Sequence, residues 1–270
     1  MARRGEVAAI TLKDRAALDG MRRAGALVAE TLALLRERCL PGVTTAELNR
    51  LADEHITARG GVPSFLGYPG PTPYPASICA SLNEVVLHGI PGPRALRDGD
   101  IISLDVGAIL DGWHGDAAIT VPVGAVSADA ARLIRDTEDA LRAGIAAARA
   151  GNRLADIAAA VQRSARRAGR GIVEGFTGHG IGREMHEPPS VPNYVVPGAG
   201  SGPVLRAGMT LTIEPMLTAG SGETVILDDG WTAVTADGSL AAHVEHTIAI
   251  AAHGPALVLT RRQAAGGRRQ

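Results

Sequence analysis

The sequence has few of the residues that stabilise small secreted domains or build cysteine metal sites. Its 270 residues include two cysteines, Cys39 and Cys79, which lie far apart and form no CxxC motif. Neither a disulfide framework nor a cysteine zinc site is therefore available. A chain of this length can bury most of the surface that its unfolded form exposes, so it needs no disulfide or structural metal to fold. Because unpaired thiols are the rule in a reducing compartment, we expect a cytoplasmic protein.

A surplus of one charge and a long hydrophobic run are also missing. The 27 basic residues, of which only Lys13 is a lysine, and the 28 acidic residues give a formal net charge of -1. DNA and anionic membranes attract proteins through surplus positive charge, so we expect neither as a partner. No segment approaches the ~20 consecutive apolar residues of a membrane span, and the first residues lack the apolar run of a signal peptide.

Hydrophobic residues spaced three and four apart predict helices in the first third of the chain. Residues 14–38 show this spacing between charged residues, and Pro41 stops the pattern. Thr44, followed three residues later by Glu47, predicts a capping box that starts a second helix ending near residue 58. A loop rich in proline and glycine is expected over 61–78, and strands are expected over 84–88, 101–106 and 117–123.

The pattern then repeats. Helices are predicted over 128–150 and 154–168, and Gly42 corresponds to Gly151 at an offset of 109 residues. At the same offset LRDGDIISLD (96–105) aligns without gaps on LRAGMTLTIE (205–214), so Asp105 corresponds to Glu214. Two copies of a helix, helix, strand unit predict pseudo-twofold symmetry and a site between the halves. We expect half-repeats at about 14–125 and 126–260, a short extension over 1–13 and a basic tail over 261–270.

Two acids of the first half are expected to share one face of a hairpin. Asp111-Gly112 is a strong two-residue turn signal, and pairing about it sets Asp105 opposite residue 118. Side chains alternate between faces, so Asp116 becomes a diagonal neighbour of Asp105, with Cα atoms about 7–8 Å apart. Two acids on an otherwise apolar face predict a bound cation. A general acid/base pair, or one acid that reaches solvent, remains an alternative.

The second half supplies further polar groups at predicted strand ends. These are His179, Glu214 and Glu245, each of which alone would more often be a structural histidine or a solvated acid. If Glu214 is the symmetry mate of Asp105, the site holds four carboxylates and one imidazole, and two divalent cations neutralise it. Such oxygen-rich ligation suits manganese, iron or cobalt at least as well as zinc. Paired ions favour hydrolysis over redox chemistry, because they lower the pKa of a shared water.

Five motifs carry a resemblance to a known family. They are SLNEVVLHGIP (81–91), LDVG with Asp116 eleven residues after Asp105, GHGIGREMHEPP (178–189), TIEPM (212–216) and VEHTI (244–248). Together they resemble the methionine aminopeptidases of type I over nearly the whole chain. The resemblance implies an α/β (α+β) pita-bread fold, in which an antiparallel curved sheet is covered by two helix pairs. Residues 14–260 then form a single catalytic domain.

The resemblance also implies roles for individual residues. Five residues hold two metal ions, and Asp116 and Glu245 bridge them. The implied ligands are Asp105, Asp116, His179, Glu214 and Glu245. His88 and His186 would contact the substrate amide and the tetrahedral intermediate, and Glu214 would carry the proton of the attacking water.

The resemblance also implies a methionine pocket, and it places scarce residue types there, because aromatic residues make up only 3% of the chain. Its members would be Tyr68, Tyr74, Cys79 and Trp231, together with Met185. The sequence departs from the family pattern at three places. Met185 stands where phenylalanine is frequent, the loop that contains Tyr74 is longer, and His243 replaces a common glutamine.

The resemblance implies removal of the initiator methionine from nascent proteins whose second residue is small. Only 31 positions separate Glu214 from Glu245, which excludes the large insertion of the type II enzymes. We further expect a monomer and a transient contact with the ribosome. The arginines of 261–270 could touch ribosomal RNA, but the pattern favours the alternative of a solvated, disordered tail. Two alternatives are another pita-bread metallopeptidase specific for Xaa-Pro bonds, and a metal-free homologue that only binds peptides.

Overall fold

The helices begin where the sequence offers capping side chains. The computed structural model describes residues 9–261 and contains α1 (Arg15–Arg38), α2 (Thr45–Thr57), α3 (Ala128–Ala147) and α4 (Leu154–Ala168). Asp14 accepts a hydrogen bond from the N–H of Ala17 at the start of α1, and Thr44 accepts one from Glu47 at the start of α2. Such caps satisfy N–H groups that have no partner inside the helix. No helix within 9–261 has the length and apolar character needed to cross a bilayer.

The strands are short, except for one long hairpin. They are β1 (Val62–Pro63), β2 (Cys79–Leu82), β3 (Val85–Leu87), β4 (Ile101–Leu110), β5 (Trp113–Pro122), β6 (Gly171–Ile172), β7 (Thr177–Gly180), β8 (Glu187–Pro192), β9 (Thr210–Ile213), β10 (Met216–Thr218), β11 (Thr224–Ile226), β12 (Ala233–Thr235), β13 (Ala241–His243), β14 (His246–Ala249) and β15 (Leu257–Val258). Their pairings are antiparallel, and in the described part of the chain they divide the predicted sheet into four smaller sheets.

The largest differences from the predicted boundaries are at three places. The helix predicted to end at residue 150 ends at Ala147, where the side-chain amide of Asn152 donates to the carbonyl of Ala147 at 2.9 Å and caps the last turn. Both strands of the β4–β5 hairpin are longer than predicted, because their pairing continues up to the Asp111-Gly112 turn. The segment 61–78, predicted to be a loop, contains the two residues of β1.

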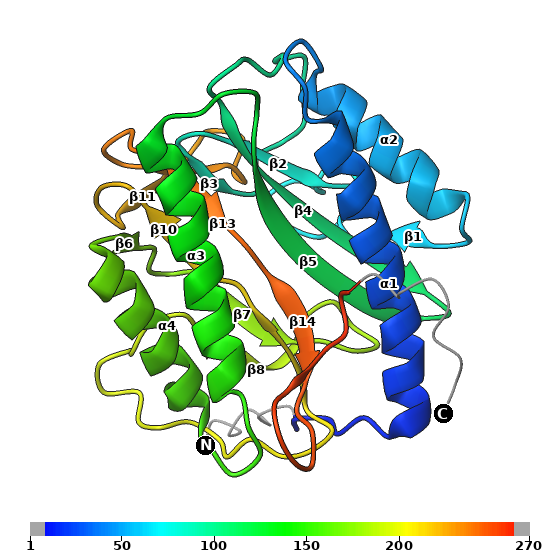
Figure 1. Cartoon of the computed structure of the whole chain (residues 1–270). Coiled ribbons are helices and arrows are strands. Elements are labelled where there is room, and N and C mark those ends of the chain that lie inside the picture. Colours follow the sequence, from blue (N-terminus) through cyan, green and yellow to red (C-terminus); the bar gives the residue numbers. More distant parts are fainter. Residues whose placement is uncertain (1–8, 262–270) are drawn as a thin grey trace, which may run out of the picture.

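The predicted internal repeat is confirmed by its hydrogen bonds. In each half, the same backbone contacts join the start of the second helix to the segment that precedes β4 or β9. The equivalent pairs are Gly42 with Leu96 and Gly151 with Leu205, then Thr44 with Ala95 and Arg153 with Val204. All four positions are related by the offset of 109 residues, so the pseudo-twofold relation reaches individual backbone bonds. Figure 1 shows α1 and α2 on one side of the molecule and α3 and α4 on the other, with β5 and β14 between them.

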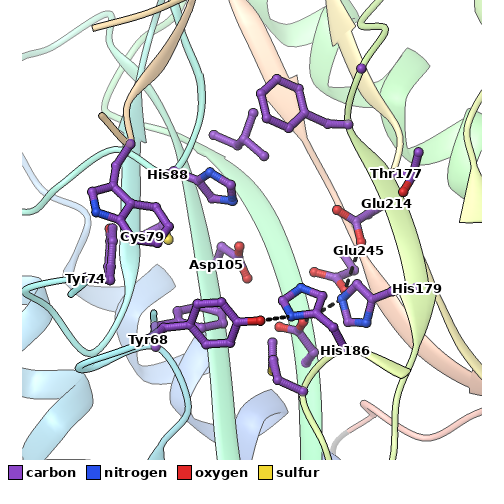
Figure 2. Close-up of a pocket in the computed structure, with 17 residues that line it drawn as sticks. Tyr68, Tyr74, Cys79, His88, Asp105, Thr177, His179, His186, Glu214 and Glu245 are labelled. Atoms are coloured by element: carbon purple, nitrogen blue, oxygen red, sulfur yellow. Dashed lines mark hydrogen bonds and ion pairs between the residues drawn. The ribbon is translucent and has the colours of Figure 1, made fainter. Parts of the chain in front are cut away.

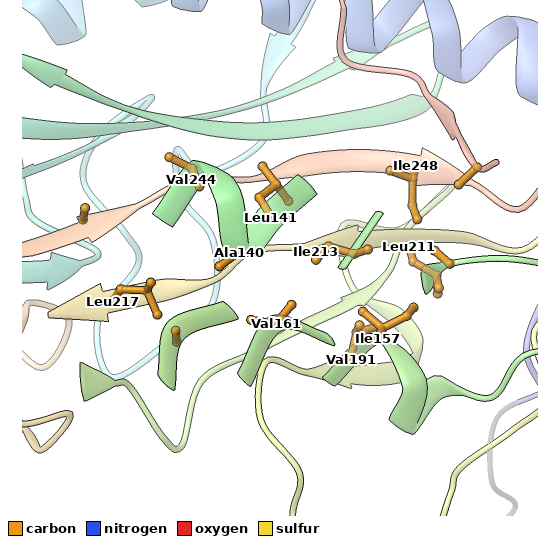
Figure 3. Close-up of a cluster of buried hydrophobic side chains, with 14 of the residues drawn as sticks. Ala140, Leu141, Ile157, Val161, Val191, Leu211, Ile213, Leu217, Val244 and Ile248 are labelled. Atoms are coloured by element: carbon orange, nitrogen blue, oxygen red, sulfur yellow. The ribbon is translucent and has the colours of Figure 1, made fainter. Parts of the chain in front are cut away.

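Each half has its own hydrophobic core. In the first half, α1 and α2 pack Leu27 and Leu48 against Leu104 of β4. In the second half, Leu141 of α3 and Ile157 of α4 pack with residues of β9 and β14, as Figure 3 shows. Burying aliphatic side chains in this way is the main force that holds the helices on the strands. The site therefore lies where the two halves meet.

Helix α1 packs closely against the backbone near Leu259, and Gly25 lies at this contact. A Cβ at Gly25 would lie 2.5 Å from the carbonyl oxygen of Leu259, and backbone atoms cannot move aside as a side chain can. Alanine in place of a helical glycine gains about 1 kcal/mol of helix propensity, whereas overpacking costs about 1–3 kcal/mol. We therefore predict that Gly25→Ala lowers the free energy of unfolding measured in urea. Gly92→Ala is the control, because a Cβ there meets nothing within 4 Å.

Candidate functional site

A cavity of about 260 Å³ lies between the halves and gathers every residue that the sequence proposed for the site. The acids and histidines on its wall are His88, Asp105, Asp116, His179, His186, Glu214 and Glu245. The remaining proposed residues on its wall are Tyr68, Tyr74, Cys79, Met185 and Trp231. Figure 2 shows the acidic groups of both halves pointing into the same space.

The β4–β5 hairpin positions the first two acids as predicted. Asp105 pairs with Ala118 and Gly107 with Asp116, so the two acids are diagonal neighbours on one face. The turn residues Asp111 and Gly112 have φ values of 53° and 72°, as a hairpin turn of this kind requires. Oδ1 of Asp105 and Oδ1 of Asp116 are buried and have no hydrogen-bond partner.

The second half brings one nitrogen and two more carboxylates to these acids. Nδ1 of His179 donates to the carbonyl of Gly180 at 2.9 Å, which leaves the lone pair of Nε2 free to bind a ligand. This Nε2 lies 3.6 Å from Oδ2 of Asp116 and 3.8 Å from Oε1 of Glu214. Glu245 follows at the start of the β14 segment, where its N–H donates to the carbonyl of Ala118 across the two halves.

Burial dominates the electrostatics of the site. It raises the pKa values of Asp105, Glu214 and Glu245 well above their ordinary range, and the charge of Asp116 raises them further. The pKa of Asp116 itself rises to about 7 for the same reason, although hydrogen bonds within the acid cluster oppose the shift. Burial lowers the pKa of His179 to about 4, so this imidazole is neutral at pH 7, as a metal ligand must be.

These residues fit a divalent metal ion. Asp116, His179 and Glu245 each offer a ligand atom, and these atoms lie within 4.8 Å of one another. Oε1 of Glu245, like Oδ1 of Asp105 and of Asp116, is buried without a hydrogen-bond partner, and buried polar atoms in this state need one. Carboxylate oxygens with one imidazole nitrogen form a donor set for hard or borderline divalent ions.

Two further histidines face the cavity from opposite walls. His186 Nδ1 shares a hydrogen bond of 2.5 Å with the Tyr68 hydroxyl, and the rings of His186 and His179 are 4.1 Å apart. His88 has a φ of 55°, a left-handed conformation that is uncommon outside glycine. Its ring meets the edges of Phe176 and Trp231 at 6.0 Å each. Burial lowers the pKa values of His88 and His186 to about 4 each.

The apolar end of the cavity is built from aromatic side chains. Tyr74 is 2% exposed and donates to the carbonyl of Gly89, so the longer loop still places it on the cavity wall. The same loop holds Trp231, whose Nε1 donates to the carbonyl of Thr72 at 3.0 Å. Met185, which departs from the family pattern, is also buried and lines the cavity.

Sequence reasoning missed several residues of the site. Both phenylalanines of the chain, Phe65 and Phe176, line the cavity. Their scarcity in the sequence is the signal by which they could have been found. Two threonines that contact the acids were also not predicted. Thr212 donates to Oε1 of Glu214 at 2.8 Å, and Thr247 accepts from the N–H of Asp116 at 3.1 Å. His243, the other departure from the family, is buried with its Nε2 unpaired, 4.0 Å from Oε2 of Glu214.

The fold and the acid cluster define a metallopeptidase, and the chain matches metallopeptidase family M24 over residues 19–252. Within it the chain belongs to the methionine aminopeptidases. It is 50% identical over 249 residues to the methionine aminopeptidase of Clostridium perfringens, covering 92% of this chain and 98% of that one. It is 52% identical over 248 residues to methionine aminopeptidase 1 of Mycobacterium tuberculosis, covering 89% and 91%. The crystal structure of methionine aminopeptidase from Rickettsia prowazekii superimposes with a TM-score of 0.89 at 42% identity, covering 93% and 100%.

The raised pKa of Asp116 predicts how the metal-stripped protein responds to pH. A carboxyl whose pKa is higher in the folded state stabilises the fold fully below its unfolded pKa of about 4 and loses that contribution as pH rises through the folded value of about 7. We predict that the free energy of unfolding of the wild type, relative to Asp116→Asn, falls over this window. Buried histidines are common to both proteins and cancel. Urea titrations in chelator at several pH values measure the difference, and a difference that does not vary with pH would contradict it.

Proposed function

We propose that the protein removes the initiator methionine from nascent proteins whose second residue is small, by metal-dependent hydrolysis of the first peptide bond. One observation carries the proposal. Four buried carboxylates and an imidazole lie beside an aromatic-lined apolar pocket, in a chain that belongs to the methionine aminopeptidases. We place this reaction in the cytoplasm, where nascent chains emerge, and assign it to a monomer.

The proposed ligands hold two divalent ions. Asp116 and Glu245 would contribute to both ions, and Asp105, His179 and Glu214 would complete the set. The unpaired oxygens of Asp105, Asp116 and Glu245 support this assignment, because each has a position open for a cation. When bound, divalent ions such as cobalt, manganese, iron or zinc supply Lewis acidity, which lowers the pKa of water and polarises the peptide carbonyl.

The chain itself moves the proton through Glu214. Thr212 donates a hydrogen bond to Oε1 of this carboxylate, so Oε2 is the oxygen left to accept the proton of the attacking water. Asn193 fixes the backbone of the same residue by donating to its carbonyl at 3.0 Å. A carboxylate held in this way keeps its geometry while the proton is taken up and then delivered to the leaving amine.

His186 and His88 stabilise the charge that develops on the substrate. The Tyr68 hydroxyl and Nδ1 of His186 share a hydrogen bond; we assign the hydroxyl as its donor, which leaves the imidazole proton on Nε2 to donate toward the peptide oxygen. His88 contacts the substrate amide from the opposite wall. Both rings are neutral near pH 7 because burial lowers their pKa values, so each acts as a hydrogen-bond donor and not as a fixed charge.

The methionine side chain occupies the apolar end of the cavity. Tyr68, Tyr74 and Trp231 surround it with aromatic edges and faces, while Cys79 and Met185 add polarisable sulfur. A thioether gains favourable contacts with aromatic rings, which suits this lining. A protein that only binds peptides is disfavoured, because four buried carboxylates without cations are costly.

The reaction is tested with a tripeptide. We predict that metal-stripped protein given divalent ions releases free methionine from Met-Ala-Ser and leaves Xaa-Pro peptides intact. Asp116→Asn should lower the rate at least ~100-fold, since it weakens the binding of both ions. Chromatography of the released amino acid measures both results. Preferential cleavage of Xaa-Pro, or full turnover by Asp116→Asn, would refute the substrate class or the ligand set respectively.

A transient ribosome contact is a second part of the proposal. Residues 262–270 of the arginine-rich tail lie outside the described residues. The described surface next to them carries Arg22, Arg142, Arg149 and Arg261 around one shallow hollow. Arg22 and Arg142 pair with Asp19 and Asp139, so Arg149 and Arg261 are the residues that support a contact with the RNA backbone.

Deletion of 261–270 tests this contact. We predict that the truncated protein co-sediments less with ribosomes at low salt and that raising the salt abolishes the difference, as expected for phosphate contacts. Hydrolysis of Met-Ala-Ser is the control and should be unchanged. Equal co-sedimentation of both proteins would remove the tail from the proposal.

A further inference from the structure

The segment that precedes α1 is bonded to the loop that carries His186. We refer to residues 11–13 as the N-terminal strap and to residues 181–187, which connect β7 to β8 and include the first residue of β8, as the site loop. The Thr11 hydroxyl donates to Oε2 of Glu187 at 2.6 Å, and Lys13 forms an ion pair with the same oxygen. Residues 174 positions apart are thus joined at one carboxylate.

Glu187 also organises the site loop from within. Its Oε1 accepts a hydrogen bond from the backbone N–H of Arg183 at 2.9 Å. One carboxylate therefore connects the strap on one side with the backbone of the site loop on the other. Met185 and His186 lie between these two attachment points, directly before Glu187 in the chain.

The ion pair is buried, and the sequence leaves room for it. The side chains of Lys13 and Glu187 are 5% and 10% exposed. Gly182 of the site loop has no side chain, and a Cβ there would lie 2.6 Å from Cε of Lys13. The strap is anchored independently, since the N–H of Lys13 donates to the carbonyl of Gly208 at 2.7 Å. Removing one partner would leave a buried charge without compensation.

The opposite side of the site loop rests on the β4–β5 hairpin. The guanidinium of Arg183 lies 3.8 Å from the ring centre of Trp113 and donates to the carbonyl of Gly112 at 2.9 Å. The hairpin thus supports the beginning of the loop, and the strap supports its end. His186, whose Nδ1 is 2.5 Å from the Tyr68 hydroxyl, lies directly before Glu187, at the end of the loop that the strap supports.

We propose that Lys13 is a positioning residue, which acts through Glu187 to hold the site loop so that His186 and Met185 face the substrate. This inference rests on the proposed function of His186. Lys13 itself lies outside the wall of the cavity, so it touches neither the substrate nor the reacting atoms. Its ammonium group holds Glu187, and through Glu187 it fixes the residues that contact the substrate.

The variant Lys13→Met keeps the aliphatic stem and removes the charge. We predict that kcat/KM for Met-Ala-Ser falls ~10-fold or more, because a displacement of about 1 Å at a catalytic group has effects of this size or larger. The metal dissociation constant, measured by calorimetry, should be unchanged, since all five proposed ligands lie outside the site loop. Thr11→Val, which removes one hydrogen bond to the same oxygen, should lower kcat/KM in the same direction by a smaller factor.

Arg170→Met is the matched control. Arg170 pairs with Asp136 at 2.8 Å, its side chain is 8% exposed, and neither residue lines the cavity. Thermal unfolding of both variants reports the general loss of stability. If Arg170→Met lowers kcat/KM as much as Lys13→Met does, or if Lys13→Met lowers it no more than two-fold, about 0.4 kcal/mol of activation free energy, the proposal is overturned.

The single lysine allows a test that needs no activity. Acetylation of amines followed by mass spectrometry reports the accessibility of Lys13 alone among the side chains. We expect slow modification in the wild type and at least ~10-fold faster modification in Glu187→Gln, because the ammonium then loses its buried partner. Equal labelling rates in the two proteins overturn the inference. If the wild type releases no methionine, the proposed function is refuted, and the labelling result alone decides whether the Lys13–Glu187 ion pair exists.

Discussion

The structure depends on the cost of burying four carboxylates together. Such a cluster is unfavourable in an apolar interior unless cations neutralise it, and burial raises the pKa of every member. The surrounding fold opposes this cost by fixing the backbone on both sides of the cluster. The N–H of Asp116 donates to Thr247, and the N–H of Glu245 donates to the carbonyl of Ala118. Both bonds join the two halves, so the acid cluster and the contact between the halves are one feature.

The two halves share a scaffold and differ in their chemistry. The repeated backbone bonds place β4 and β9 equivalently, and the corresponding acids, Asp105 within β4 and Glu214 directly after β9, each enter the site from their own half. The first half adds a second acid through the β4–β5 hairpin, whereas the second half adds the imidazole of His179. Symmetry thus sets the positions, and local sequence sets which atoms occupy them.

Local patterns and the internal repeat were sufficient to predict the helices, the Asp111-Gly112 hairpin and the register that makes Asp105 and Asp116 neighbours. They operate over short distances or at a constant offset, and the sequence displays both directly. Contacts between loops could not be predicted, because no periodicity relates their partners. Trp231 on the carbonyl of Thr72, and Glu187 with Lys13, are such contacts. The pocket and the positioning of His186 depend on them, so only the three-dimensional structure reveals these parts of the site.

The order of the clustered acids along the chain has a consequence for biosynthesis. The acids that approach one another in the fold are spread from residue 105 to residue 245, and the last belongs to the segment that pairs back onto the centre of the molecule. During translation the β4–β5 hairpin, which carries Asp105 and Asp116, is synthesised before Glu214 and Glu245. Before that point the bonds from the N–H of Asp116 to Thr247 and from the N–H of Glu245 to the carbonyl of Ala118 cannot form. The complete acid cluster therefore assembles only after Glu245 has been synthesised, together with the hydrogen bonds that join the two halves.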